Sequence, residues 1–416
     1  MKKSKVRKDS KGHVLHAGEY ERSDAGIKSR YMYVHNDASG NKSYVYAEDL
    51  QTLRQKEDEI SYYWHDNIDV ITAGRLTVNN LFDRMMSLKV DLKDNVKANY
   101  IYMYDRFIRD GFGTRKIIDI KYSDAKAFYY GLIVDKKMSA ATVENIHTLL
   151  HPTFELAIKD GYIRTNPTDG IVKEIKKGSL SSKNKRVTLT EKQTKAFFGF
   201  LKDHEVFGHW YNMLIILYGS GMRIGELVGI RWEDIDLESN TISVNHNVVY
   251  FRQPDGKFKL VFHEIPKTEA GIRDIPMFDF VREAVIEVYE LQKEIGFSDY
   301  SLDGHTGFVF TSRMGSVFVP NVINKAIGRI IDAYNTAEIE KALKANRSAE
   351  LLPHFSCHSL RHTICARLCE VEDNVKFIQE FMGHADITTT MDIYAEFSAE
   401  KKQEKVTTLS KKINME

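Results

Sequence analysis

Apolar and polar residues alternate in two short runs near the start of the chain. The runs SRYMYVHN (29–36) and KSYVYAE (42–48) are rich in aromatic residues, and the glycine-containing segment DASGNK joins them. Alternation with a period of two is typical of strands that are covered on one face. Together with the glycine-containing loop, the two runs predict a β-hairpin.

The apolar spacing changes to three or four residues directly after this hairpin. In EDLQTLRQKEDEI (48–60), Leu50, Leu53 and Ile60 suit one face of a helix, and most other positions are charged or polar. The pattern predicts an amphipathic helix that packs on the sheet. We therefore expect residues 1–75 to form a small β-sheet-plus-helix N-terminal module, suited to binding rather than to catalysis.

The middle of the chain carries the helical period throughout. Four stretches have apolar residues at this spacing: TVNNLFDRMMSL (77–88), VKANYIYMYDRFI (96–108), YSDAKAFYYGLIV (122–134) and SAATVENIHTLLHPTFELAIKDGYI (139–163). Ser139 and Thr142 are candidate N-caps, and Asn-Pro at 166–167 marks a stop. Residues 76–172 are therefore expected to form an all-α bundle of four or five helices.

The rest of the chain begins with a charged, serine-rich stretch, KEIKKGSLSSKNKR (173–186), which we interpret as a linker. Beyond it, WEDIDLESNTISVNHNVVY (232–250) predicts two strands around a Ser-Asn turn. KFKLVFHEIPKTEAGIRDIPM (257–277) predicts two more, with KTEAG at the tip of a second hairpin. Helical patterns flank these strands, so residues 187–416 are expected to be an α+β domain.

Composition and charge add few constraints. A chain of 416 residues is long enough for two or three domains. No apolar run approaches the roughly eighteen residues of a membrane span, and the N-terminus lacks the apolar core of a signal peptide. The 59 basic and 58 acidic residues nearly cancel, but residues 1–30 hold nine Lys/Arg against four Asp/Glu. That excess fits a nucleic-acid contact or an exposed basic tail, and we expect a soluble, intracellular protein.

A zinc site is the first alternative to consider near the C-terminus. His358, His362, Cys365 and Cys369 are spaced i, i+4, i+7 and i+11. On one straight helix these residues extend over about 16 Å, whereas the ligands of a tetrahedral zinc lie within roughly 4 Å of one another. We therefore reject zinc. With Cys357, the cysteines form an odd, clustered set that fits a reducing compartment and small core residues.

Two cationic residues lie where the chain turns. Arg223, in GSGMRIGELVGIRWEDID, follows a glycine-broken turn and opens a short helix, where a guanidinium and backbone N–H groups can face one anion. Lys267 lies at the tip of the second predicted hairpin, from which a mobile loop can carry an ammonium into a site as a proton donor. Each signal alone is weak, because most such residues are simply solvated.

Four further candidates lie near the C-terminus. His358 and Arg361 are three apart in HSLRHT and share a helix face. His384 follows a glycine in MGHADITTTMDIY, which ends at Tyr394. The chain has no nucleophilic Ser or Cys motif, no P-loop and no GxGxxG. Converging cations suit a phosphodiester whose transition state gains negative charge. They can also stabilise the phenolate of an attacking tyrosine, whose free pKa is about 10.

As a set, these residues resemble the active site of tyrosine recombinases. The resemblance covers essentially the whole chain, and the opening residues, from RKDSKGHVLHAGEYERSDAGIKSRYMYV to YVYAEDLQTLRQKEDEI, resemble more narrowly the integrases of conjugative transposons. It implies the following domains: 1–75, arm-type DNA-binding; 76–172, helical core-binding; 173–186, linker; 187–416, catalytic with a C-terminal tail.

The resemblance also implies how the phosphate is attacked. Tyr394 would attack the scissile phosphate, forming a 3′-phosphotyrosyl link and releasing a 5′-hydroxyl. Arg223, Arg361 and His384 would hold and neutralise the phosphate oxygens. The covalent link conserves the energy of the phosphodiester, so no cofactor, ATP or metal is implied.

Proton transfer and arginine orientation involve three more residues. Lys267 would protonate the leaving 5′-oxygen, and His358 would assist proton transfer at Tyr394. Glu226 lies one turn beyond Arg223, where it either orients that arginine or is a solvated surface residue.

The implied partners are double-stranded DNA with core-type and arm-type attachment sites, and three further copies of the chain in a tetramer on two DNA sites. Excisionase and DNA-bending proteins are candidate accessory partners. The reaction is expected to take place in the bacterial cytoplasm, on nucleoid DNA, and no membrane is involved. The tail after Tyr394 either docks on a neighbouring protomer or is a frayed end. Residues 332–355 are either an element-specific contact or a surface helix, and we favour the surface helix.

Alternative classes are a temperate-phage integrase, a type IB topoisomerase-like enzyme and a non-catalytic DNA-binding regulator. A regulator would not need six aligned active-site residues. An arm-type module favours recombination over relaxation.

Overall fold

The computed structural model describes residues 7–23, 28–36, 42–64, 70–177, 187–253, 256–264 and 271–395, with the side chains of 59–64 and 70–71 excluded. The chain divides into two compact units, residues 1–183 and 184–416. Among the described residues, no helix is long and apolar enough to cross a membrane. The predicted C-terminal tail, residues 396–416, and Lys267 lie outside the described residues.

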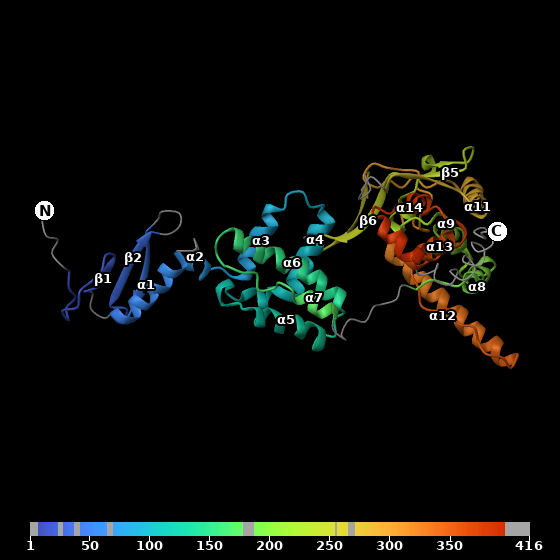
Figure 1. Ribbon diagram of the computed structural model, residues 1–416. Helices are drawn as coiled ribbons and strands as arrows, with labels where there is room; N and C mark the ends of the chain where they lie inside the picture. Colours follow the sequence, from blue (N-terminus) through green and yellow to red (C-terminus); the bar gives the residue numbers. More distant parts are fainter. Residues whose placement is uncertain are drawn as a thin grey trace, which may run out of the picture. The chain divides into compact units, whose positions relative to one another are not determined.

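The first unit begins with a three-stranded antiparallel sheet (Figure 1). Its strands are β1 (Glu19–Glu21), β2 (Tyr31–Asn36) and β3 (Lys42–Ala47), in that order. The pairing of β2 with β3 confirms the predicted hairpin, whose loop at 37–41 lies outside the described residues. The alternation did not predict β1, because three residues are too few to show a period.

Helix α1 (Leu50–Trp64) covers one face of this sheet, as the amphipathic pattern predicts. Tyr31, Ala47 and Leu53 are buried between them, and Leu50 packs against this cluster. The side chain of Ile60 lies outside the described residues.

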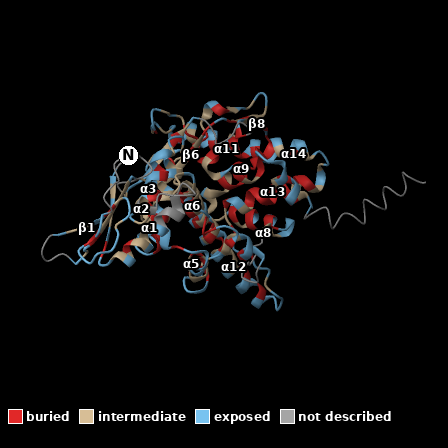
Figure 2. Ribbon diagram, turned by 60° about the vertical axis from the view of Figure 1, so that its left-hand side comes forward, coloured by how far each residue is buried: buried red, intermediate tan, exposed pale blue. Residues whose placement is uncertain are grey.

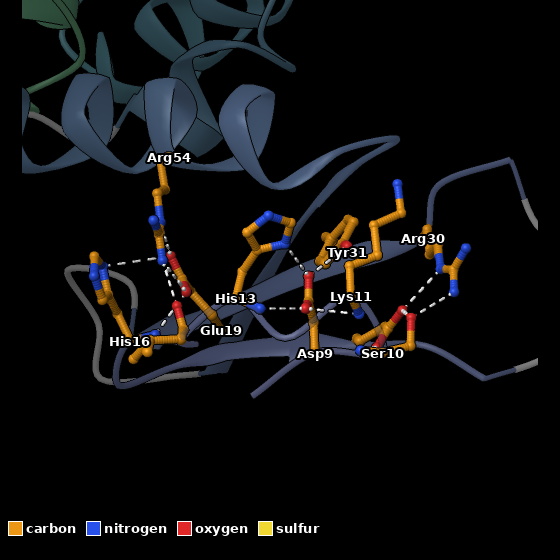
Figure 3. A network of polar contacts seen from close by, with 11 residues as sticks. Asp9, Ser10, Lys11, His13, His16, Glu19, Arg30, Tyr31 and Arg54 are labelled. Atoms are coloured by element: carbon orange, nitrogen blue, oxygen red, sulfur yellow. Dashed lines mark hydrogen bonds and ion pairs between the residues drawn. The ribbon is translucent and has the colours of Figure 1, made fainter. Parts of the chain in front are cut away.

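A polar network also fastens the helix to the sheet (Figure 3). Arg54 of α1 donates from Nε to Glu19 of β1 at 2.9 Å. Within the sheet module, Asp9 accepts a hydrogen bond from the Tyr31 hydroxyl of β2 at 2.8 Å. The helix therefore leaves only the opposite face of the sheet uncovered.

The rest of the first unit is helical, as predicted. Its elements are α2 (Val70–Ala73), α3 (Val78–Leu88), α4 (Asp94–Tyr104), η1 (Asp105–Arg109), η2 (Phe112–Thr114), η3 (Ile117–Asp119), α5 (Tyr122–Val134), α6 (Ala140–Lys159) and α7 (Ile171–Lys177). Their apolar faces form one buried cluster, separate from that of the sheet module. Ser139 caps α6 by accepting from the N–H of Thr142, so Ser139 was the correct N-cap candidate and Thr142 was wrong.

The predicted linker begins too early. Residues 173–177 continue α7, and Ile175 is buried in the core of the bundle. The contact of Ile175 was missed at the level of sequence because lysines surround it there. One buried side chain per turn is nevertheless enough to hold a short helix against a bundle. Residues 178–186 lie outside the described residues.

The second unit is built around two buried helices, α9 (Tyr211–Ser220) and α13 (Cys357–Val371), which Figure 2 shows as buried along most of their length. The surrounding elements are α8 (Glu191–Lys202), η4 (Gly208–Trp210), α10 (Ile224–Gly229), η5 (Trp232–Asp234), α11 (Asp279–Ile295), α12 (Pro320–Lys344) and α14 (Val375–Met382). Cys357, Cys365 and Cys369 are all buried on α13, which confirms their interpretation as core residues.

The strands of this unit make two small sheets and confirm the α+β class. The sheets are β4 (Ile235–Asp236), β5 (Thr241–Val244) and β8 (Arg273–Pro276) in the order β4-β5-β8, and the hairpin β6 (Asn247–Arg252) with β7 (Phe258–His263). The two strands that flank Lys267 therefore pair with other strands and not with each other. The prediction that Lys267 tips their hairpin was wrong, because short alternating runs do not specify a partner.

The predicted surface helix forms the second half of α12. The chain then returns along that helix, where Asn335 donates to Leu352 O at 3.0 Å and Glu338 accepts from Arg347 at 2.6 Å. The stretch is thus an ordered extension of the second unit.

Candidate active site

Gly221, whose backbone is in the left-handed region, makes the turn between α9 and Arg223. Helix α9 ends at Ser220, Gly221 has φ 61°, and Arg223 is the N-cap of α10. A side chain at Gly221 would be strained at this φ, and a Cβ there would lie 2.9 Å from Met382 Sδ. The predicted glycine-broken turn is therefore correct, and it lies against the end of α14.

Three arginines donate hydrogen bonds to backbone carbonyls at the end of α14. Gly383 caps the helix with φ 63°, and the last carbonyls of a helix have no donors within it. Phe381 O accepts from Arg273 Nε at 2.9 Å, Met382 O accepts from Arg361, and Gly383 O accepts from Arg223 Nη2 at 2.8 Å.

Arg223, Arg273 and Arg361 are called the arginine cluster below. A helix C-terminus carries partial negative charge and unsatisfied carbonyls. It can therefore hold the three cations side by side despite their mutual repulsion.

Arg361 is the most enclosed member of the cluster. Only 2% of it is exposed, and it also donates to Gly221 O, which joins α13 to both turns. Burial, followed by the charge of Arg223, lowers its pKa to about 9. That value still leaves the guanidinium cationic at neutral pH.

Glu226 lies between two of the arginines. It is 5% exposed and accepts from Arg223 N at 2.9 Å, from Arg223 Nη1 at 2.8 Å and from Arg273 Nη2 at 3.0 Å. Burial raises the pKa of this carboxyl, but Arg273 and Arg223 outweigh burial and bring it below its usual value. The alternative of a solvated glutamate is therefore wrong.

Sequence reasoning missed Arg273. Its position in IRDIP is indistinguishable from that of an exposed arginine on a strand. The buried acid that it serves comes from a helix 47 residues earlier, a distance over which a single sequence gives no signal.

His384 follows the turn and is buried. Its Nδ1 lies 2.9 Å from Thr390 Oγ1. Burial, together with the charges of Arg361 and Arg223, lowers its pKa to about 3. The expectation that this histidine adds positive charge is therefore wrong for the protein without DNA. In the tautomer whose Nδ1 accepts from Thr390, the neutral ring carries its proton on Nε2 and can donate to an anion.

Tyr394 and His358 are the two remaining candidates that the structure describes. Tyr394, on the helical segment 387–395, packs against the core of the unit, and its hydroxyl lies 3.5 Å from Asp373 Oδ1. His358 is exposed on the first turn of α13, with its ring centroid 4.4 Å from that of His362. The described contacts thus bring Arg223, Arg361 and His384 together around one turn.

The low pKa of His384 predicts a loss of stability in acid. The unfolded chain binds a proton near pH 6.5 and the folded chain only near 3, so stability falls as the pH drops below 6.5. From pH 7 to pH 5 this loss is about 2 kcal/mol, and His384→Asn should remove it. Urea unfolding followed by the fluorescence of Trp210 and Trp232 measures the difference, and equal pH dependence of both proteins would refute the assignment.

Two turns that gather arginines and a histidine, with a tyrosine ten residues further along the chain, have the residue pattern of the tyrosine recombinase class. Residues 187–401, just over half of the chain, match the Phage integrase family, and residues 3–62 match the DNA binding domain of tn916 integrase. The chain belongs to the phage integrase family, as an integrase like those of conjugative transposons.

Relatives match along nearly the whole length. The transposase from transposon Tn1545 of Streptococcus pneumoniae is 29% identical, and that from transposon Tn916 of Enterococcus faecalis is 28% identical. Each alignment covers 94% of this chain and 94% of the relative. Among solved structures, the Tn1549 transposon integrase in complex with transposon right end DNA gives a TM-score of 0.68 at 28% identity, over 79% of this chain and 99% of that chain.

Proposed function

We propose that this protein integrates and excises a mobile element of the conjugative-transposon kind by cutting and rejoining DNA through a 3′-phosphotyrosyl intermediate. The observation that carries the proposal is the arginine cluster on the end of α14. Arg223 remains 44% exposed while Glu226 and Gly383 fix its orientation. A preorganised cation of this kind stabilises charge that develops on a phosphate.

In this mechanism Arg223 and Arg361 hold the non-bridging oxygens of the scissile phosphate. Neutral His384 donates from Nε2 to the same phosphate, with Thr390 setting its tautomer. Tyr394 attacks the phosphorus and displaces the 5′-oxygen. The DNA must draw the tyrosine hydroxyl away from Asp373 for this step.

Two proton transfers accompany the attack. His358, exposed at the start of α13, assists removal of the proton from Tyr394, and Lys267 protonates the leaving 5′-oxygen. The role of Lys267 rests on the resemblance of its motif alone.

The test uses DNA that spans both ends of the protein's own element. The full-length chain is incubated with this DNA in EDTA, and products are resolved in SDS. We expect a protein–DNA adduct that protease removes, together with joined DNA ends. Cleavage that appears only after a divalent ion is added back would contradict the proposal.

We propose the domain division 1–75, 76–172 and 187–416, with a linker that begins after α7. The described parts of the three segments have separate buried clusters, which supports this division. The first segment serves arm-type sites, and the other two serve core-type sites.

The uncovered face of the N-terminal sheet supports arm-site binding. Tyr20, Tyr44 and Tyr46 are between 41% and 47% exposed, and the strand register places them on the face opposite α1. Arg7 and Arg22 lie over two of these rings, each 5.0 Å from a ring centroid. Strands can enter a DNA groove with such a face, contacting base edges with side chains and phosphates with arginines.

Arg22→Ala and Tyr44→Ala, made singly in the full chain, should each weaken binding to arm-type DNA about tenfold, since one good contact contributes roughly 1–3 kcal/mol. Cleavage at core-type DNA should not change. Gln55→Ala, on the exposed side of α1, is the matched control. Gel shifts at fixed salt measure both sites, and normal arm binding by both variants would exclude this face.

The assembly and setting follow from the same proposal. Four copies act together on two double-stranded DNA sites, with excisionase and DNA-bending proteins as accessory partners. The reaction takes place in the bacterial cytoplasm, on nucleoid DNA. The near full-length match to transposon relatives favours a conjugative transposon over a temperate phage as the source element.

A further inference from the structure

Arg273 is a buried cation that the proposed chemistry does not use. It opens β8, a few residues after Lys267, and its side chain is 6% exposed. Its Nη2 donates to Glu226 at 3.0 Å, its Nε to Phe381 O at 2.9 Å and its Nη1 to Gly271 O at 3.1 Å. All three nitrogens of Arg273 therefore have protein acceptors, whereas Arg361, which is also enclosed, donates only from Nη1 and Nη2 in the described contacts.

Arg223 differs from Arg273 in a way that separates their roles. Both arginines donate to Glu226, but the side chain of Arg223 is 44% exposed. A phosphate can reach Arg223, whereas Arg273 is enclosed by β8, α10 and the end of α14. Arg273 can therefore affect the reaction only through the groups that it holds.

Glu226 is the group that the removal of Arg273 would affect most. Its neighbours with charge are Arg223 at the start of α10, Arg273 on β8 and Arg361 on α13. Burial alone favours the protonated carboxyl, and a protonated carboxyl is a poorer acceptor for a guanidinium. Without Arg273, Glu226 takes a proton more readily and loosens its hold on Arg223.

We propose that Arg273 is a positioning residue for strand cleavage: it keeps Glu226 charged and in place, so that Glu226 directs Arg223 at the scissile phosphate. The same side chain fastens β8, the strand after Lys267, to the last turn of α14. This role rests on the proposed function of Arg223 as a phosphate ligand. It requires Arg273 to affect the rate of cleavage more than the affinity for DNA.

The experiment compares Arg273→Gln and Arg273→Lys in the full-length chain. Single-turnover cleavage of a core-type substrate is measured from pH 5.5 to 8.5, beside the affinity for the same DNA. We expect Arg273→Gln to cleave at least tenfold more slowly at pH 7, with a Kd within about threefold of the wild type. Its rate should also fall on the acid side at a higher pH than that of the wild type, because Glu226 becomes protonated sooner.

Arg273→Lys separates charge from geometry. Lysine retains the positive charge but cannot make all three contacts. The cleavage rate of Arg273→Lys should therefore fall in acid at nearly the same pH as that of the wild type. At pH 7 its rate should lie between those of the wild type and Arg273→Gln. Arg282→Gln, on the exposed face of α11, is the matched control and should behave as the wild type. If Arg273→Gln fails to fold, the double variant Glu226→Gln/Arg273→Gln replaces it, because it leaves no buried carboxylate that has lost one of its two arginines. We expect this double variant to cleave no faster than Glu226→Gln alone.

Three results would overturn the proposal. They are a wild-type cleavage rate in Arg273→Gln or in the double variant, a loss of DNA affinity in proportion to the loss of rate, and a slow Arg273→Gln whose pH profile matches the wild type. The wild-type protein reports separately on the proposed function. If it forms no adduct, that function fails, whereas an active wild type with an unaffected variant refutes the role of Arg273 alone.

Discussion

Tyr394→Phe should abolish covalent protein–DNA adducts while changing the affinity for core-type DNA less than about twofold. The substitution removes only the hydroxyl oxygen that attacks phosphorus, and the ring can still pack against the core of the catalytic unit. The tyrosine hydroxyl lies 3.5 Å from Asp373 Oδ1, so the substitution removes a long polar contact there. The measurement is SDS electrophoresis of labelled DNA beside a gel shift.

Tyr334→Phe is the matched control, since its hydroxyl donates only a 3.3 Å hydrogen bond to Glu350 O at the surface of α12. This variant should form adducts at the wild-type rate. An SDS-resistant adduct in Tyr394→Phe would show that another residue is the nucleophile.

The second large effect is expected for Arg361→Gln, in both catalysis and stability. Removing one preorganised donor from a developing anion lowers a rate by roughly 10²–10³-fold. The change also leaves the buried carbonyls of Gly221 and Met382 without the donors they now have. Each unsatisfied group costs about 1–3 kcal/mol, so we expect the two carbonyls together to lower the unfolding free energy by about 2–6 kcal/mol.

Single-turnover cleavage and urea unfolding measure the two effects. Arg329→Gln, on an exposed position of α12, controls for the general loss of an arginine. An Arg361→Gln protein with normal stability would mean that the arginine does not join the two turns in solution.

The sequence was sufficient where the signal was local. The period-two run predicted the β2–β3 hairpin, and the glycines predicted the turn that exposes Arg223. Pairing of β5 with β8 was not predictable, because these two strands lie far apart in the chain. For the same reason Arg273 was missed, and Glu226 could only be left between two alternatives.

The charge of His384 was beyond sequence reasoning for a different reason. Its identity suggested a cation, yet burial beside two arginines keeps it neutral. A protonation state depends on the surroundings of a side chain, and these surroundings come from α13, α10 and the α14 turn together. Motif spacing identified the residue, and only the packed structure assigned its charge.

The carbonyls of Phe381, Met382 and Gly383 have a consequence for how this protein can diverge. Because three arginines from three elements are each matched to one of three successive peptide groups, inserting or deleting a single residue here would shift all three pairings together. Individual side chains in this turn can change while their backbone carbonyls remain. The length of the segment therefore tolerates less variation than its composition, and relatives that retain this chemistry should differ in length elsewhere.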